Sequence, residues 1–470
     1  MRRLSTSLAL LFYAALAPAV PPAHSSPADS ASSKPAPALV SAVPTQLADL
    51  LQLYEQTLAT NPVLKGREFA VDQAEAQLDQ AFSKLLPQIM ATGTVNWNSY
   101  SEPKTDFLGH EIGTITSRYE GHRGIIQARQ ALFDLPSFLR FEGADATKSQ
   151  TEQELEAARM ALTADLIDRY FTVLEASDEM GYLQGEKALT EGDLNRIRRM
   201  YERQLAMVTD LYEVEAYYQT LLTREIEVAN ARAVALEKLR ETTGLLVEGV
   251  APLARDRLPD VPGQAEQWVQ DAESHHPALL ALQRAIEAAE KNIASARAEH
   301  LPKLDLQASQ TWSGNIGFDN RPFPRYDVGT VGVQINVPIF SGGAIEAAAR
   351  DAVARYHMSV ERRTEKRREI ERETRTAWLN AKAGRARVDS TAKEVEARDK
   401  ARTAQEKSYE LGIATIVALL ESKKNLLKSR FEQAQARYDY IRALVSLRLW
   451  GGSLSYQDIK DINGWLAKRP

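Results

Sequence analysis

LPQIMATGTVNW (residues 86–97) and LPKLDLQASQTW (residues 301–312) are two versions of one element. Each begins with Leu-Pro and ends with Trp, and the offset between them is 215 residues at both ends. Because the residue before a proline is disfavoured in a helix, the Leu-Pro marks a helix end, and an extended run follows it. The repetition predicts that the two halves of this 470-residue chain follow one plan.

The repeat extends upstream into a helix that lies between two prolines. Pro62 stands 25 residues before Pro87, and Pro277 stands 25 residues before Pro302. Proline is tolerated in the first turn of a helix, where its missing N–H would have no partner. Each half is therefore expected to place such a helix directly before its first extended run.

A second extended run follows in each half. In DVGTVGVQINVPIF (327–340) apolar residues occupy alternate positions, which is the period of a strand with one apolar face. The equivalent run GIIQARQALF (124–133) alternates less clearly. With the first extended runs included, we expect strands at about 88–102, 118–133, 303–314 and 326–340.

Two very long helices are expected after each strand pair. No proline occurs in residues 137–192 or 343–402, which are rich in Ala, Glu, Arg and Leu. At 1.5 Å per residue, a helix of about 60 residues would be about 90 Å long. Apolar residues later in each half step by four and three, as in helices that supercoil. These residues are Leu222, Ile226, Ala229, Ala233 and Leu236 in the first half and Leu427, Phe431, Ala434, Tyr438, Ile441 and Val445 in the second. The expected helices are at about 135–200, 205–243, 342–408 and 415–450.

The N-terminal residues have the composition of an export signal and a leader. Arg2 and Arg3 precede the apolar run SLALLFYAALA (7–17), and small residues follow it. We expect a signal peptide at 1–23 rather than a membrane anchor, because the run is shorter than the ~20 residues that span a bilayer. The Ser-, Pro- and Ala-rich residues 24–46 are expected to be a disordered leader.

Composition and charge narrow the classes of function. The formal net charge is −5, which argues against a nucleic-acid binder. The mixed-sign run at 361–375 is interpreted as the solvated face of a long helix rather than as a nucleic-acid patch. The chain has no cysteine, which excludes thiolate metal sites, cysteine nucleophiles and lipid anchors on cysteine. After the signal, no stretch offers ~18 consecutive apolar residues, so entry into a membrane would need a β-barrel.

The sequence offers no catalytic or cofactor-binding constellation. His275-His276 is the one close pair among seven histidines, and adjacent residues lack the i, i+4 spacing of a helical metal site. The pair occupies the position of Thr60-Asn61 in the first repeat, so we expect it to cap a helix. The glycines at 342–343 lack the Lys and Ser/Thr of a phosphate loop. We therefore expect no metal, no cofactor and no enzymatic activity.

The expected elements form two repeats, at 47–250 and 263–452, with a linker at 251–262 and a tail at 453–470. Four strands per chain cannot close a barrel, which needs about eight, and an open sheet in lipid leaves unpaired edges. Three chains would supply twelve strands and a ring of long helices. The predicted fold is mainly α with a membrane β-barrel, completed by a homotrimer.

Over residues 47–460 the chain resembles the TolC family of outer-membrane channel-tunnels. The matching motifs are NP (61–62), LLPQ (85–88), HP (276–277), LPKLDL (301–306), VPIFSGG (337–343), YELGIATIVALLES (409–422) and ARYDYIRALVSLRLWGG (436–452). The resemblance implies a homotrimer with a twelve-stranded β-barrel in outer-membrane lipid and an α-helical barrel in the periplasm. It also implies two partners, a periplasmic adaptor (membrane fusion protein) and an inner-membrane ABC or proton-driven pump. The duct would export drugs, toxins or secreted polypeptides.

A second hypothesis is a periplasmic coiled-coil adaptor or scaffold without a barrel. The alternating apolar positions of 327–340 argue against it, because a soluble coiled coil needs no such strand. The absent N-terminal cysteine excludes the anchor of the lipidated efflux subgroup and favours type I secretion or a multi-use duct. The sequence does not name the cargo, because the pump selects it.

The resemblance also implies a periplasmic gate at the two helix-to-helix turns that lie away from the strands. Thr209 and Asp210 would be acceptors on the first turn, and Tyr409 would be the donor on the second. Glu421 would be a carboxylate that lines the pore.

Two residues at the second turn depart from the family pattern. Ala414 stands where the family's prototype has an arginine, and Ala418 stands where it has an aspartate. A salt bridge and one ring of carboxylates are therefore expected to be missing, and the Asp210–Tyr409 link would carry more of the closure.

Overall fold

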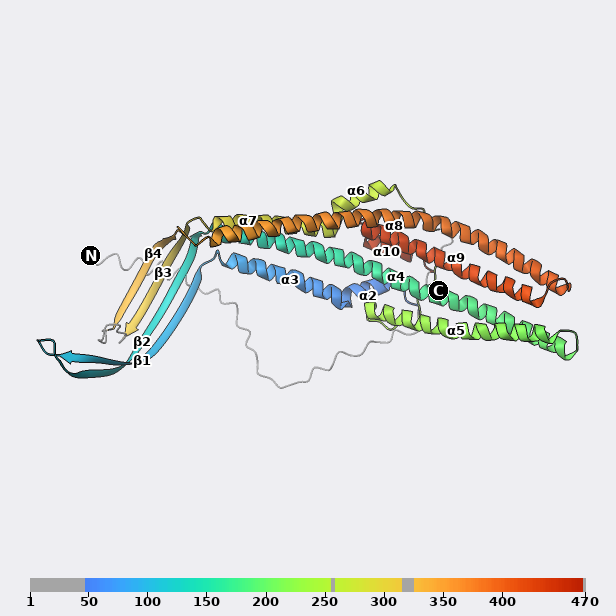
Figure 1. Cartoon of the computed structure of the whole chain (residues 1–470), viewed down its shortest axis with the longest axis horizontal. Helices are drawn as coiled ribbons and strands as arrows, with labels where there is room; N and C mark the ends of the chain where they lie inside the picture. The colour runs from blue at the N-terminus through green and yellow to red at the C-terminus, as the bar shows by residue number, and fades with distance from the viewer. Residues whose placement is uncertain (1–46, 255–257, 315–324, 468–470) are drawn as a thin grey trace. The chain divides into compact units, whose positions relative to one another are not determined.

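The computed structural model describes residues 47–254, 258–314 and 325–467, and the signal and leader expected at 1–46 lie outside these residues. One order of elements occurs twice, with two short helices, two strands and two long helices (Figure 1). The first set is α2 (Leu50–Thr60), α3 (Pro62–Ser83), β1 (Gln88–Thr105), β2 (Glu111–Phe133), α4 (Leu135–Glu202) and α5 (Val208–Thr243). The second set is α6 (Ala265–His275), α7 (Pro277–Ala298), β3 (Lys303–Gly314), β4 (Tyr326–Asn336), α8 (Ala344–Glu410) and α9 (Ile416–Trp450), and α10 (Tyr456–Asn463) follows it.

Helices α3 and α7 begin in the same way in the two halves. Each has proline at its first position, and the residue before that proline caps the helix. The side-chain oxygen of Asn61 accepts hydrogen bonds from the first backbone N–H groups of α3, and Nδ1 of His276 accepts one from Ala278 at 3.1 Å. The prediction that the His275-His276 pair caps a helix is confirmed for His276.

The strands of the described residues form one antiparallel sheet in the order β1-β2-β3-β4. The two repeats meet at β2 and β3, where Gly124 lies opposite Trp312. In this chain β1 and β4 are the edges of the sheet.

The first hairpin is longer than the sequence predicted. β1 reaches Thr105 and β2 begins at Glu111, so residues expected in a loop are paired. The turn is closed by Asp106, whose Oδ1 accepts hydrogen bonds from the N–H groups of Leu108 (2.8 Å) and His110 (2.9 Å). The sequence did not predict this extension, because its side chains are mostly polar and exposed on both faces and no alternation of apolar residues marks a strand. β4 ends at Asn336 rather than at about 340, because Pro338 has no N–H for a ladder.

Two helices of unusual length dominate the chain. α4 has 68 residues and α8 has 67, which corresponds to about 100 Å each. α4 packs against α5, α7 and α9, and α8 packs against α6, α7 and α9. Within the described part of the chain, no helix is both long enough and apolar enough to cross a bilayer.

The main core lies where the two halves meet. It contains Tyr170 and Phe171 of α4, Tyr440 of α9 and Ile459 of α10, all fully buried. The hydroxyl of Tyr440 donates to the carbonyl of Pro259 at 2.6 Å, and the hydroxyl of Tyr170 donates to that of Ala251 at 2.8 Å. The segment after the second repeat is therefore not a simple tail, since α10 completes this core.

Candidate functional site

The two helix-to-helix turns lie side by side at the same end of the helices (Figure 1). Residues 203–207 join α4 to α5, and residues 411–415 join α8 to α9. Gln204 and Gly412 have φ of 60° and 73°, the left-handed conformation that lets a chain reverse after a helix. One apolar cluster joins the turns, and its buried members are Leu194, Ile197, Val214, Ile416, Leu419 and Leu420. The turns of the two repeats therefore form one packed unit.

Thr209 and Asp210 both lie in the first turn of α5. Thr209 is exposed, and Asp210 is half-buried. A carboxylate near a helix N-terminus is stabilised by the unpaired N–H groups there. The cap residue Met207 offers no side-chain acceptor, so Asp210 is the acidic group at this end.

Tyr409 of α8 packs against the apolar cluster of the turns. Burial, and then the charge of Asp210, raise the pKa of Tyr409, while Arg196 lowers it and Asp193 raises it further. The structure thus brings Tyr409 and Asp210 into electrostatic contact. A direct hydrogen bond between the two side chains stays a prediction.

Glu421 lies on the exposed side of α9. Its side chain is 60 % exposed, and the Lys424 ammonium lies 3.9 Å from it. The amide of Asn425 donates to its Oε1 at 3.4 Å. Ala414 and Ala418 are half-buried and carry no charge, so Glu421 is the acidic group of this segment.

A buried charge lies behind the turns and was not predicted from the sequence. Lys423 is 7 % exposed, and its ammonium forms an ion pair with Asp193 of α4. The signal was visible in α9, since Lys423 occupies the apolar seam between Leu420 and Leu426, both of which are buried. A lysine at such a position needs a partner in the opposing helix.

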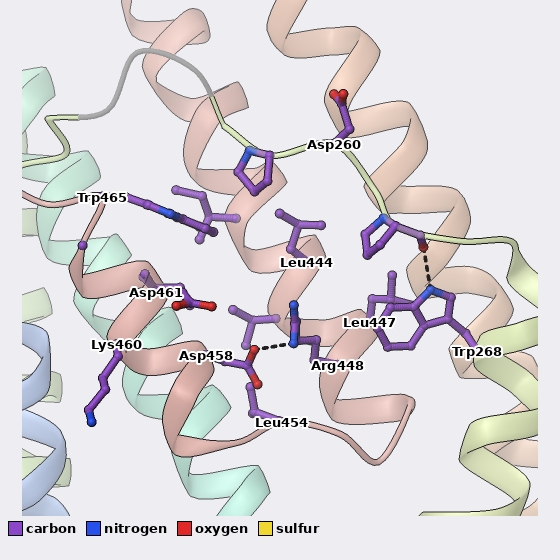
Figure 2. Close-up of a pocket in the computed structure, with 16 residues that line it drawn as sticks. Asp260, Trp268, Leu444, Leu447, Arg448, Leu454, Asp458, Lys460, Asp461 and Trp465 are labelled. Carbon is purple, nitrogen blue, oxygen red and sulfur yellow. Dashed lines mark hydrogen bonds and ion pairs between the residues drawn. The ribbon is translucent and has the colours of Figure 1, made fainter.

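A cavity of about 580 Å³ lies between α9, α10 and residues 259–262, and Figure 2 shows the residues that line it. Two interactions cross its wall, an ion pair between Arg448 and Asp458 and a hydrogen bond from Nε1 of Trp268 to the carbonyl of Pro262 at 2.8 Å. These polar groups already hold the junction together.

Across residues 47–254, 258–314 and 325–467, no three His, Asp or Glu side chains stand close enough together to hold an ion.

The family comparison agrees with the two-repeat architecture. Residues 53–245 and 268–453 match the family described as outer membrane efflux protein. The two matched blocks correspond to the two repeats, and they leave out the segment between α5 and α6. The match covers most of the chain and confirms the resemblance drawn from the motifs.

Individual relatives are similar over nearly their whole length. The chain is 26 % identical over 422 residues to outer membrane protein TolC of Vibrio cholerae, which covers 89 % of this chain and 94 % of that protein. It is 27 % identical over 432 residues to the proteases secretion protein PrtF of Dickeya chrysanthemi, which covers 90 % and 92 %.

Solved structures share the fold. The Campylobacter jejuni CmeC outer membrane channel superposes with a TM-score of 0.74 at 16 % identity, over 89 % of this chain and 90 % of that one. CusC superposes with a TM-score of 0.74 at 17 % identity, over 88 % and 94 %. The chain belongs to the outer membrane efflux protein family, and it is an exit duct of the outer membrane.

Proposed function

We propose that three copies of the chain assemble into one duct. The observation that carries this proposal is the four-stranded sheet, whose edge strands β1 and β4 leave backbone groups unpaired within the described chain. Three such sheets joined edge to edge give twelve strands, enough to close a β-barrel. The long helices of the three chains would then form an α-helical barrel in the periplasm.

The exposed face of β4 supports insertion in lipid. Val331, Val333 and Ile335 lie on one face of the strand and are 58 %, 61 % and 64 % exposed. A row of bare apolar side chains is costly in water and favourable against acyl chains. A periplasmic coiled-coil adaptor or scaffold without a barrel has no use for such a face.

The names of the relatives support a proposal for the cargo and the partners. PrtF and the alkaline protease secretion protein AprF are named for protein secretion, whereas TtgC is named as a probable efflux pump outer membrane protein. We infer that the duct passes secreted polypeptides from an inner-membrane ABC transporter through a periplasmic adaptor. Small-molecule efflux with a proton-driven pump is the second candidate.

The gate is proposed at the two turns. Asp210 and Tyr409 would hold the turns together, with Thr209 as a further acceptor beside them. Their support is the shared apolar cluster and the effect of the Asp210 charge on Tyr409. Glu421 would line the pore, since its carboxylate is exposed beside this cluster.

The assembly can be tested with one pair of matched variants. Light scattering in detergent is expected to give about 150 kDa, three chains of about 50 kDa, and planar bilayers should show single channels. Val333→Asp places a charge on the apolar face and should abolish trimers in the outer membrane. Gln334→Asp, on the opposite face of β4, should leave them intact. A chain that stays monomeric with native helix content would contradict the proposal.

A further inference from the structure

The two hairpins of the sheet have the same register when they are compared through the repeat. In the first hairpin Gln88 of β1 lies opposite Arg129 of β2, and in the second Lys303 of β3 lies opposite Asn336 of β4. Gln88 and Lys303 are 215 residues apart, the offset of the two Leu-Pro motifs, and Arg129 and Asn336 are 207 residues apart. One offset therefore relates β1 to β3, and a second relates β2 to β4.

The sequence supports the second offset independently. Phe133 and Phe340, which end the two predicted strands, are also 207 residues apart, and so are Gln127 and Gln334. The residue that corresponds to each strand position in the other half is thus known without reference to the pairing of β2 with β3.

One seam of the sheet lacks a counterpart within the described chain. β2 pairs with β3, and Arg129 lies opposite Gln307. The two offsets carry these residues to Asn336 of β4 and Thr92 of β1. β4 and β1 are the two edges of the sheet, so one chain does not bring them together. A second copy of the chain can supply the missing partner.

We propose that β4 of one chain pairs with β1 of the next in the register of the β2–β3 seam, so that Asn336 lies opposite Thr92 of the next chain. The proposal rests on the trimeric duct proposed above and specifies the contact that closes it. The antiparallel ladder then runs to Tyr326, which lies opposite Glu102 of the next chain. All 11 residues of β4 find a partner in this register, and every partner lies within β1.

A proline in β1 falls where this ladder ends. Pro103 directly follows Glu102, the last paired residue. Proline has no N–H to donate to a ladder and is confined to positions where none is needed. Because Pro103 is already paired with Thr114 of β2, its missing N–H is on the side of the next chain. A register displaced by two residues in that direction would place Pro103 inside the ladder, opposite Asp327.

The proposed register joins faces of the same polarity. Val333, on the apolar face of β4, lies opposite Val95 of the next chain, and these side chains are 61 % and 52 % exposed in the single chain. Gln334, on the other face, lies opposite Thr94 of the next chain. Successive side chains of a strand point to opposite faces, so a displacement by one residue would set the valines of β4 against polar residues of β1.

Trp97 gains in this contact the neighbour that its counterpart already has. The counterpart, Trp312 of β3, lies opposite Gly124 of β2, and a Cβ atom on Gly124 would lie 3.7 Å from Cε3 of the Trp312 ring. Trp97 lies opposite Glu120 of β2, but its other side is the edge of the described sheet. It is 81 % exposed, against 43 % for Trp312. In the proposed register Val331 of the adjoining chain lies on that side, which makes Trp97 the aromatic anchor of the contact.

Disulfide cross-linking measures the register directly. The chain has no cysteine, so each introduced pair reports one contact. Opposite residues of antiparallel strands have Cα atoms about 4.5–5.5 Å apart, which suits a disulfide, whereas diagonal neighbours are about 7–8 Å apart. Thr94→Cys with Gln334→Cys should therefore give covalent dimers and trimers that a reductant returns to single chains. The two cysteines cannot link within one chain, because three strand spacings of about 4.8 Å separate β1 from β4.

Two mismatched pairs are the controls. Thr92→Cys with Gln334→Cys and Asn96→Cys with Gln334→Cys displace one cysteine by two residues on the same face, and each should give about a tenth of the cross-linked product or less. If either pair links better than Thr94 with Gln334, the register is wrong. If none of the three links in chains that light scattering shows to be trimers, β1 and β4 do not meet. A chain that stays monomeric would instead overturn the proposed function.

An exchange of side chains tests the anchor. Trp97→Val should lower the temperature at which the trimer dissociates in detergent, because the seam loses its largest apolar contact. Adding Val331→Trp returns the indole to the same seam from the other strand and should recover most of the loss. Phe107→Ala, in the turn of the first hairpin and outside the ladder, is the control, since Phe107 is 95 % exposed and its loss should leave the temperature unchanged. If Trp97→Val dissociates like wild type, or the exchange recovers nothing, Trp97 does not anchor the next chain.

Discussion

His276 makes the stability of the fold depend on pH. The residue is 7 % exposed, and Nδ1 of its ring accepts the hydrogen bond that caps α7. Burial, and then the Lys366 charge, lower the pKa of His276 from 6.5 to about 4, against an opposing effect of Glu369. Protonation would place a charge in this buried position and would also remove the acceptor of the cap.

The sign and size of the effect follow from these two pKa values. The folded chain keeps the ring neutral down to about pH 4, whereas the unfolded chain protonates it below pH 6.5. The contribution of the neutral His276 ring to the free energy of unfolding is therefore complete above pH 6.5, and it is lost as the pH falls through 4. At ~1.4 kcal/mol per pKa unit, the difference corresponds to about 3 kcal/mol per chain.

The substitution that tests this reasoning is taken from the first repeat. Asn61 caps α3 as His276 caps α7, so His276→Asn should keep the cap and remove the titration. We expect the melting temperature of this variant in detergent to fall less than that of wild type between pH 7 and pH 4.5. His275→Asn changes the exposed neighbouring residue, and its melting temperature should fall as much as that of wild type over this pH range. If the melting temperature falls equally in wild type and in His276→Asn, the pH dependence does not come from this ring.

Three further predictions concern the gate, the mature chain and a close contact. Tyr409→Phe should raise single-channel conductance by removing a link of about 1–2 kcal/mol per chain, and adding Asp210→Ala should change it little more. If both variants conduct like wild type, packing alone holds the turns. The intact mass of purified protein should place the mature N-terminus near residue 24 with no acyl group, and added lipid mass would contradict this. Gly452→Ala should lower the melting temperature, because φ is +70° and a Cβ atom would lie 2.8 Å from Cα of His276.

The sequence predicted the architecture well because its signals are local and occur twice. Leu-Pro marks the end of a helix and the alternation in 327–340 marks a strand, and each signal acts over a few residues. The extension of β2 to Glu111 was missed because both faces of that hairpin are exposed, so no apolar period marks it. Pairing with β1, rather than burial, extends the strand.

The helix faces were harder to predict, and α5 shows why. The apolar steps through Ile226 predicted a seam there, but Ile226 is 72 % exposed in the chain. The buried face of α5 instead passes through Val214, Leu221 and Val228, seven residues apart. Both faces have heptad spacing, so periodicity alone cannot say which one faces α4. The partner of each helix decides, and that is a property of the tertiary structure.

The distribution of charge between the helices bears on how the duct moves. The contacts of α4 with α5 include an apolar cluster of Leu183, Leu221 and Val228. The contacts of α4 with α9 include ion pairs of Arg442 and Lys423, and they also include apolar packing of Leu194 and Ile197 against Leu419 and Leu420. Sliding an apolar contact exposes surface to water at about 25 cal/mol per Å². Both contacts of α4 therefore resist sliding, and we expect α4, α5 and α9 of one chain to move together as one body.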